Sequence, residues 1–485
     1  MKKILFIIIA AIYSLTSLAQ EVKSPVITCR GNSRTVDIRD FYSNAGNVFE
    51  LPFDAPERRA QSKPEGFRWI DRIYNLPDFM YTFYENYGEM VSGVLKGESN
   101  CLSDPTLATN MGQDLYAMDL TTIKKTFTVY FPTDAPGQLP SIVANAVRDT
   151  AHNYFNEIDC FMPYLFMCLS FDYPQAFWIG NNYTWFESYG YQYSYWMQGP
   201  NAGTCKVDLE YHANYLVKST GFDLRIDEFQ SDSTITEGVA LFNSTIDSIS
   251  VNLPLTTRCA QIIYLNDWLT THNCYSTALG SANVPTIVWS PMSAIKGSTG
   301  STGPVCEGYA RAFKVLCDRI GIPNILAVGF ARSSQFHDGE AHMWNEVQMD
   351  DELWYGVDVT WNDPVTMWSD VVSTDAVSGF ENNDWLLVGK KTVINGLAFE
   401  ESHPNSISVN SNNTDKWSFS NESLLTDRAF DISDIVINPI AEPTEPVNVY
   451  SITGVLKGSY NTIGEALTNT SPGLYIIGNR KIVIK

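Results

Sequence analysis

Three residues, Cys306, His342 and Asp358, are of the types that together activate a thiol for attack on a carbonyl group. A cysteine attacks as the thiolate, a histidine can take and return its proton, and a carboxylate can hold the histidine in position. Cys306 lies two residues after the end of residues 295–304, which are rich in Gly, Ser and Thr and are expected to form an exposed, mobile loop. A nucleophile at that point would be accessible to a substrate.

The segment after this loop has the pattern of a helix that begins at Cys306. Apolar side chains recur on one face as far as Ile320, and Gly321 is a typical helix stop. Unpaired amide groups and the helix dipole at a helix N-terminus stabilise an anion. The expected helix would therefore favour the Cys306 thiolate.

Three strands are expected next, at residues 325–331, 341–349 and 352–361. Side chains alternate along a strand, so direct pairing of His342 with Asp358 requires an odd-numbered turn, such as residues 349–351. The turn lacks the Asn-Gly or Asp-Gly that a two-residue connection prefers, which favours the odd turn. We expect His342 and Asp358 to be paired on the face toward Cys306, about 3 Å apart.

Each of these residues also has an ordinary interpretation. A cysteine is often a small buried hydrophobe, a histidine can simply sit in a strand, and an aspartate is usually a surface carboxylate. Cys317, on the apolar face of the same helix, is expected in the core. His337 and His403 carry no supporting motif and are interpreted as structural or surface residues.

Composition limits the classes of protein that the chain can represent. The 485 residues suggest about three domains, and 44% hydrophobic residues are enough for a sizeable core. The net charge of −22 argues against nucleic-acid binding, which needs a basic field. No pair of cysteines has C-x-x-C spacing and the six histidines form no cluster, so neither a metal nor another cofactor is expected.

The N-terminus has the pattern of a secretory signal, residues 1–19. Two lysines precede an apolar run that is too short to span a membrane, and small residues follow at the cleavage site. The mature protein is therefore expected to be secreted or displayed at the cell surface. An odd count of nine cysteines leaves at least one thiol unpaired, and Cys306 is expected to be that thiol.

Three ordered blocks resemble the core of the transglutaminase-like superfamily. They are residues 305–313 (VCEGYARAF), 342–347 (HMWNEV) and 354–361 (WYGVDVTW). The resemblance implies a papain-like α+β fold in which Cys306 is the nucleophile, His342 the general base and acid, and Asp358 the orienting carboxylate. The same resemblance covers residues 255–385 well and residues 127–252 only faintly.

The donor that would complete an oxyanion site is left open. No glutamine precedes Cys306 at the distance used by papain-type proteases. The resemblance to transglutaminase-like enzymes instead suggests an upstream aromatic residue, first Tyr275 and second Trp289, although either could be a core aromatic. No acidic loop for calcium is evident.

The remaining chain is divided into an N-terminal region of mixed α/β type, residues 20–243, a transglutaminase-like domain, residues 244–437, and a C-terminal unit, residues 447–485. Helices are expected at residues 139–165 and 255–270, a strand at 127–131, and buried core at 161–180. A Pro/Glu linker, residues 438–446, precedes the last unit. That unit resembles the C-terminal sorting domain read by the type IX secretion system; otherwise it is simply a small terminal β-sandwich.

These features predict a secreted cysteine enzyme that acts on protein or peptide amides through a thioester, as a transglutaminase or a cysteine peptidase. Cross-linking and hydrolysis share one site, so the three residues do not separate them. The alternative is a catalytically silent surface binding or assembly module that retains the fold, since exposed Tyr and Trp are good contact residues. The oligomeric state is not indicated by the sequence.

The linker interpretation predicts that truncation at Asn438 leaves the rest of the protein intact. Because a linker separates units that fold independently, the truncated chain should keep its thermal unfolding midpoint and the alkylation rate of Cys306. Delivery to the cell surface, measured by fractionation, should stop. Unfolding of the truncated chain would show that the linker and sorting-domain interpretations are wrong.

Overall fold

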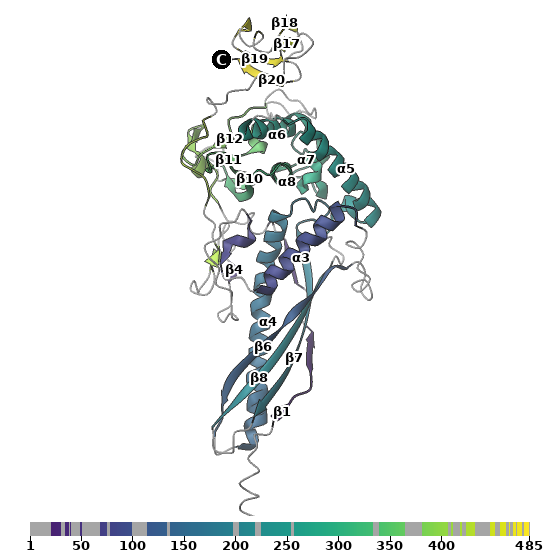
Figure 1. Cartoon of the computed structure of the whole chain (residues 1–485), viewed down its shortest axis with the longest axis vertical. Helices are drawn as coiled ribbons and strands as arrows, with labels where there is room; N and C mark the ends of the chain where they lie inside the picture. The colour runs from purple at the N-terminus through teal and green to yellow at the C-terminus, as the bar shows by residue number, and fades with distance from the viewer. Residues whose placement is uncertain are drawn as a thin grey trace, which may run out of the picture.

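The protein is described by a computed structural model (Figure 1). The described residues are 21–30, 34–37, 39, 49–50, 68–74, 78–98, 114–132, 136–196, 203–218, 225–253, 257–332, 339–363, 381–405, 409–410, 418–419, 423–431, 447–451, 456–461, 465, 469–471, 473–477 and 480–484. The expected signal, residues 1–19, the linker, residues 438–446, and His337 lie outside them. Within the described part of the chain, no helix combines the length and hydropathy needed to cross a bilayer.

A long antiparallel sheet dominates the N-terminal region. Its strands follow the order β1-β7-β8-β6, and β2 and β3 also pair with β7. The bounds are β1 Glu21–Lys23, β2 Ile27–Arg30, β3 Arg34–Asp37, β6 Asp114–Tyr130, β7 Asn182–Trp196 and β8 Thr204–Lys218. The expected strand at 127–131 forms the end of β6.

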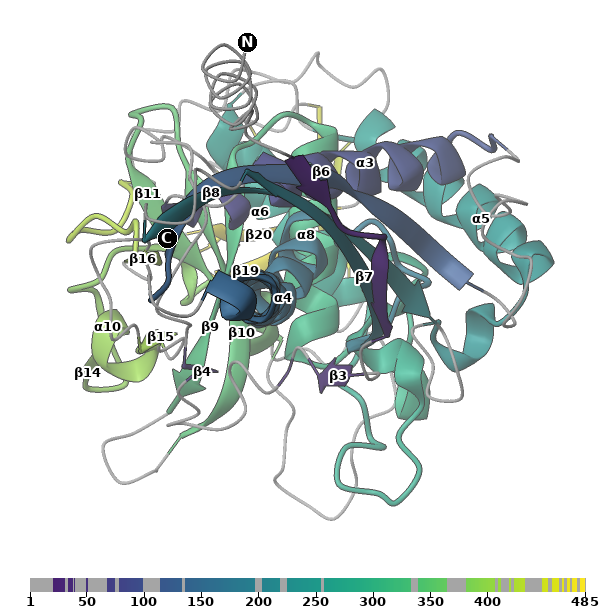
Figure 2. The ribbon, with the colours of Figure 1, turned by 90° about the horizontal axis from the view of Figure 1, so that it is seen from below.

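Helix α4, Leu139–Asp172, lies in the concave side of this sheet (Figure 2). It extends the helix expected at 139–165 by seven residues, about two turns, and it contains Pro163. Most of the described side chains in the apolar stretch, from residue 162 to residue 179, are buried in the core, as expected. The smaller N-terminal elements are β4 Phe49–Glu50, η1 Ile70–Arg72, β5 Ile73–Tyr74, α3 Asp78–Leu95, η3 Pro136–Gln138 and η4 Asp227–Phe229.

The central part of the chain places helices against a second antiparallel sheet of order β12-β11-β10-β9. Its elements are α5 Asp232–Val251, α6 Arg258–His272, η5 Thr286–Trp289, α7 Pro291–Ile295, η6 Gly300–Thr302, α8 Cys306–Arg319, β9 Asn324–Ala331, β10 Glu340–Gln348, β11 Trp354–Val357, α9 Val359–Asn362 and β12 Leu386–Val388. Helices and antiparallel strands that segregate in this way define an α+β fold, as expected.

Short elements follow the central sheet and return along it. They are β13 Val393–Ile394, β14 Leu397–Ala398, α10 Phe399–Ser402, β15 Val409–Asn410 and β16 Ser418–Phe419. The C-terminal strands β17 Val447–Ser451, β18 Leu456–Tyr460, β19 Gly473–Ile477 and β20 Arg480–Ile484 form one antiparallel sheet of order β18-β17-β19-β20. The described strands of this unit thus make a single layer, not the two layers of a sandwich.

Helix α8 is buried on every side from residue 307 to residue 317, not on one apolar face as expected. Its charged residues are compensated internally, because Arg311 forms an ion pair with Glu307 at 2.7 Å. Asn181 donates to Glu307 at 2.9 Å and accepts from Arg311 at 2.9 Å, and Arg311 also reaches Ser170. A buried ion pair needs such additional partners to offset its lost hydration. The N-terminal region supplies them here.

One hydrophobic core runs through the N-terminal region and the central part, from Trp69 to Leu387. The Trp69 indole nitrogen donates to the Leu326 carbonyl of β9 at 3.0 Å, within this core. The boundary predicted between residues 243 and 244 falls inside α5, which packs against α3, α7 and α8. The two predicted domains are therefore packed as one unit in the described residues.

The register of β10 and β11 differs from the expected one by two residues. Asn345 pairs with Val357 and Gln348 with Trp354, whereas His342 pairs with Gly329 on β9 and not with Asp358. β11 ends at Val357, four residues before the expected end of the strand.

The turn explains this difference. Asp351 accepts from the Leu353 amide at 3.0 Å, and Glu352 takes a left-handed φ of 65°, so residues 349–353 form a longer turn. An offset of two residues preserves the alternation of faces, and Asp358 still lies on the side of His342.

A buried carboxyl group next to α8 predicts a pH-dependent change in stability. The Tyr309 hydroxyl donates to Asp363, and burial raises the pKa of Asp363 to about 7. Between pH 3.8 and 7 the folded protein thus keeps a proton that the unfolded chain loses, and the free energy of unfolding falls as pH rises through that window.

Asp363→Asn keeps an acceptor for Tyr309 and cannot ionise, so it removes this loss. We expect the variant to exceed the wild type in free energy of unfolding by on the order of 2–4 kcal/mol at pH 8 and by nothing near pH 4, measured in urea. Asp384→Asn, an exposed aspartate, is the matched control and should show no difference. Equal stabilities of Asp363→Asn and wild type at pH 8 would contradict this account.

Candidate active site

Cys306 is the first residue of α8, as the sequence predicted, and its side chain is half-buried. The Val305 residue before it offers no side-chain cap, so the first amides of the helix stay available to an anion. Gly308 lets this end of the helix approach η5 closely, because a Cβ there would lie 2.5 Å from the Val288 carbonyl oxygen. The packing therefore fixes where the thiol points.

Cys306 is one of several free thiols, not the single unpaired one that was expected. Cys168, Cys205, Cys259 and Cys317 are also free of disulfides, but all four are buried. Burial raises the pKa of Cys259 to about 11, and raises that of Cys168 and Cys317 well above the usual value. Among these five thiols, Cys306 is the accessible one. The side chains of Cys29, Cys101 and Cys160 lie outside the described residues.

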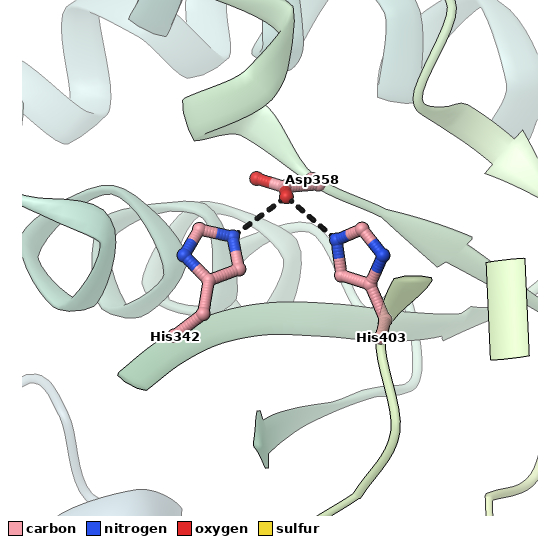
Figure 3. Close-up of side chains that lie close together, drawn as sticks. All are labelled: His342, Asp358 and His403. Atoms are coloured by element: carbon pink, nitrogen blue, oxygen red, sulfur yellow. Dashed lines mark hydrogen bonds and ion pairs between the residues drawn. The ribbon is translucent and has the colours of Figure 1, made fainter. Parts of the chain in front are cut away.

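The imidazole of His342 and the carboxylate of Asp358 are hydrogen-bonded, with His342 Nε2 2.7 Å from Asp358 Oδ2 (Figure 3). His342 lies on β10, and Asp358 follows β11 as the N-cap of α9. The second carboxylate oxygen of Asp358 accepts from the Trp361 amide at 3.1 Å, and its own amide donates to the Trp385 carbonyl. The capping geometry, more than a strand pairing, therefore orients this carboxylate.

The Cys306 thiol lies close enough to His342 to interact electrostatically with its ring. Since Asp358 occupies Nε2, Nδ1 is the ring nitrogen left for the thiol. Burial alone would lower the pKa of His342, but the charge and hydrogen bond of Asp358, together with Cys306, raise it to about 10. Burial would likewise raise the pKa of Asp358, yet His342 and His403 hold it well below its ordinary value. The structure thus connects Cys306, His342 and Asp358 in that order.

Tyr275 lies close to Cys306. Burial, followed by the charge on Cys306, raises the pKa of the Tyr275 hydroxyl far above its usual value. Trp289, the second candidate, instead lies under the Arg39 guanidinium, 4.8 Å from it, and lines a cavity with Arg311. The geometry therefore places Tyr275, of the two aromatics, beside Cys306.

The glycine-rich loop before Cys306 is only partly exposed, whereas it was expected to be exposed. The Cys274 amide donates to Ser298, the Ser276 amide to Pro304 and the Thr277 amide to Gly300, at 3.0–3.2 Å. Gly303 permits this contact, because a Cβ there would lie 2.1 Å from the Cys274 carbonyl oxygen. Small residues serve close packing here, and the loop fixes the segment that carries Tyr275.

His403 is a further member of this cluster, although no sequence motif indicated it. Its Nε2 lies 3.0 Å from Asp358 Oδ2, the oxygen that also bonds His342, and its side chain is fully buried (Figure 3). The interpretation of His403 as a possible surface residue is therefore wrong. No local pattern could have revealed it, because the ring follows the four-residue helix α10 and reaches Asp358 only through the tertiary fold.

An aromatic wall encloses the two histidines. The Phe399 ring is stacked on His403 at 4.2 Å between centroids, and Trp361 lies 4.6 Å from His403 and 5.4 Å from His342. Trp344 and Trp385 also contact the His403 ring. These rings exclude water from the Asp358 side of the site, which strengthens its hydrogen bonds.

His342, Asp358 and His403 also have the composition of a metal site. Their ligand atoms lie within 4.8 Å of one another, and no other such group of three occurs in the described part of the chain. Both histidines, however, approach the same oxygen at hydrogen-bonding distance, so Asp358 is engaged as an acceptor for two N–H groups. The donor set fits a hydrogen-bonded carboxylate better than a coordinated ion.

Residues 249–359 match the family model described as the transglutaminase-like superfamily. The match contains Tyr275, Cys306, His342 and Asp358, and ends before His403. A comparison with curated proteins gives no match to the chain. The central part of this α+β protein therefore contains a transglutaminase-like domain, which supports a role based on the cysteine.

The Cys306–His342 contact predicts how the thiol reacts. His342→Gln removes the group that takes the thiol proton, so we expect alkylation of Cys306 by iodoacetamide at pH 6 to slow by at least about tenfold. Peptide mass mapping over time measures the rate at Cys306 specifically. His272→Gln, at an exposed histidine on α6, is the control and should react like the wild type. Equal alkylation rates in His342→Gln and His272→Gln would show that His342 does not activate the Cys306 thiol.

Proposed function

We propose that the protein is a secreted cysteine enzyme that transfers or hydrolyses acyl groups at protein or peptide amides. The observation that carries the proposal is the chain of contacts from the Cys306 thiol through His342 to the buried Asp358. Burying an ionised carboxylate is costly unless it is fully hydrogen-bonded. Its role here is to hold an imidazole against a thiol at the start of a helix, which is the arrangement that thiol catalysis needs.

The first half of the proposed reaction forms a thioester. The Cys306 thiolate attacks the carbonyl carbon of a carboxamide or peptide bond, and the carbonyl oxygen becomes an oxyanion. The Cys306 amide and the Tyr275 hydroxyl, which lie close together in the free protein, would both donate to that oxygen. His342 then passes its proton to the departing amine, the carbon–nitrogen bond breaks, and the acyl group remains on sulfur.

The second half releases the acyl group to an acceptor. A lysine amine that attacks the thioester gives a cross-link, whereas water gives a carboxylic acid. His342 takes the proton of the incoming nucleophile, and the thiolate leaves as it was at the start. Asp358 stays ionised throughout and keeps the imidazole oriented.

Export is a further part of the proposal. The N-terminal signal pattern supports a substrate outside the cell, and the resemblance of residues 447–485 to a sorting domain supports recognition by secretion machinery. The rival function, a silent binding or assembly module, remains the outcome to expect if the thiol does not turn over.

Incubation of the protein with a glutamine-containing peptide and a labelled primary amine tests the proposal. We expect incorporation of the amine with release of ammonia, or peptide cleavage, because the site can form a thioester. Mass spectrometry would detect an acyl adduct at Cys306.

Cys306→Ala should abolish both reactions, while Cys317→Ala, at a buried thiol of the same helix, is the matched control. If neither incorporation, ammonia release, cleavage nor an acyl adduct is detected with wild-type protein across a peptide library, the binding-module alternative is favoured.

A further inference from the structure

His403 lies outside the segment that matches the transglutaminase-like family, yet its ring contacts the orienting carboxylate. We propose that His403 is a positioning residue of the site: its neutral Nε2–H group donates to the same Asp358 oxygen that accepts from His342, so that two histidines share one carboxylate. This inference rests on the proposed function, and it adds a fourth member to the Cys306–His342–Asp358 site.

The proton positions follow from the hydrogen bonds. Asp358 is ionised and can only accept, so the proton of a neutral His403 must lie on Nε2. The Ser402 hydroxyl oxygen lies 2.8 Å from His403 Nδ1, and the same hydroxyl donates to the Phe399 carbonyl at 3.0 Å. Burial, against the opposing effect of Asp358, lowers the pKa of His403 to about 4, in agreement with a neutral ring. His403 therefore donates to Asp358 through Nε2.

The surroundings of His403 keep this ring neutral and fixed. Asp358 and His342 are the titratable groups that face it, and the other neighbours are the rings of the aromatic wall. The two glutamates of α10 are engaged elsewhere: Glu400 pairs with Lys391, and Glu401 accepts from the Ala398 amide. A ring stacked on Phe399 and bonded at both nitrogens cannot turn away from Asp358 without losing these contacts.

Sharing the carboxylate changes what Asp358 does to His342. A second donor on Oδ2 disperses the negative charge that holds the His342 proton. An imidazolium that retains its proton too strongly would be a poor acid for the departing amine. Proton transfer is most efficient when the pKa of the acid lies near the working pH. His403 thus limits how strongly Asp358 retains that proton while it fixes the carboxylate in place.

Two substitutions separate this role from simple packing. His403→Phe keeps a ring in the aromatic wall and removes the donor, whereas His403→Gln keeps an N–H near the position of Nε2. With the peptide and amine that the wild type uses, we expect His403→Phe to lower kcat by about 10–100-fold with KM nearly unchanged. The alkaline limb of its pH profile should move to higher pH. His403→Gln should recover most of kcat and the wild-type limb.

A second measurement needs no turnover. NMR titration of ¹⁵N-labelled histidines between pH 8 and 10.5 should show the His342 ring retaining its proton to higher pH in His403→Phe than in wild type or His403→Gln. If His403→Phe does not fold, as judged by circular dichroism, Ser402→Ala replaces it and should give a smaller shift in the same direction. If the wild type shows no turnover but the shift in the His342 titration is present, the proposed enzymatic function is rejected and the positioning role of His403 is retained.

Three results would overturn the inference. The first is an unchanged His342 titration in folded His403→Phe. The second is equal loss of kcat in the Phe and Gln variants with no movement of the pH profile, which is the signature of packing alone. The third is stoichiometric metal in the purified protein that is lost from His403→Phe, because both Nε2 atoms would then be ligands and not donors.

Discussion

The requirement that the buried Asp358 carboxylate stay ionised organises the site. Water is excluded around it, so three protein groups must replace its hydration: the imidazoles of His342 and His403 and the Trp361 amide. These donors come from β10, from the segment after α10 and from α9, and their elements must meet at one point. The aromatic wall and the Trp385 backbone contact hold that meeting point in place. The position of the nucleophile relative to its base follows from this arrangement.

Local patterns in the sequence predicted α8 and the three strands after it, because periodicity and helix stops are encoded nearby. The roles of Cys306, His342 and Asp358 came instead from the resemblance of three sequence blocks to a known family. The register of β10 and β11 was predicted wrongly, since it depends on Asp351 closing a longer turn. The glycine-rich loop is less exposed than expected, because small residues also permit close packing, and Gly303 here packs against the Cys274 carbonyl. His403 could not be predicted, because its partner lies 45 residues away with no pattern joining them.

Residues 249–359, which match the family model, do not by themselves reveal how much of the chain packs around α8. The burial of α8 shows why. A helix with Glu307 and Arg311 one turn apart looks like an exposed face with a surface ion pair. In the structure both are buried, and Asn181 and Ser170 form hydrogen bonds that replace part of their lost hydration. The N-terminal region is thus part of the environment that makes α8 stable, even though it carries no residue of the Cys306–His342–Asp358 site.

The bond from the Trp69 indole to the Leu326 carbonyl joins residues 257 positions apart, and this separation has a kinetic consequence. During synthesis the N-terminal sheet and α4 leave the ribosome long before β9 exists. Their inner apolar surface then stays uncovered until β9 has been synthesised. Contacts that close such large loops also form slowly. Chaperones that hold such a chain until synthesis ends would act on the apolar side of α4, the surface that β9 finally covers.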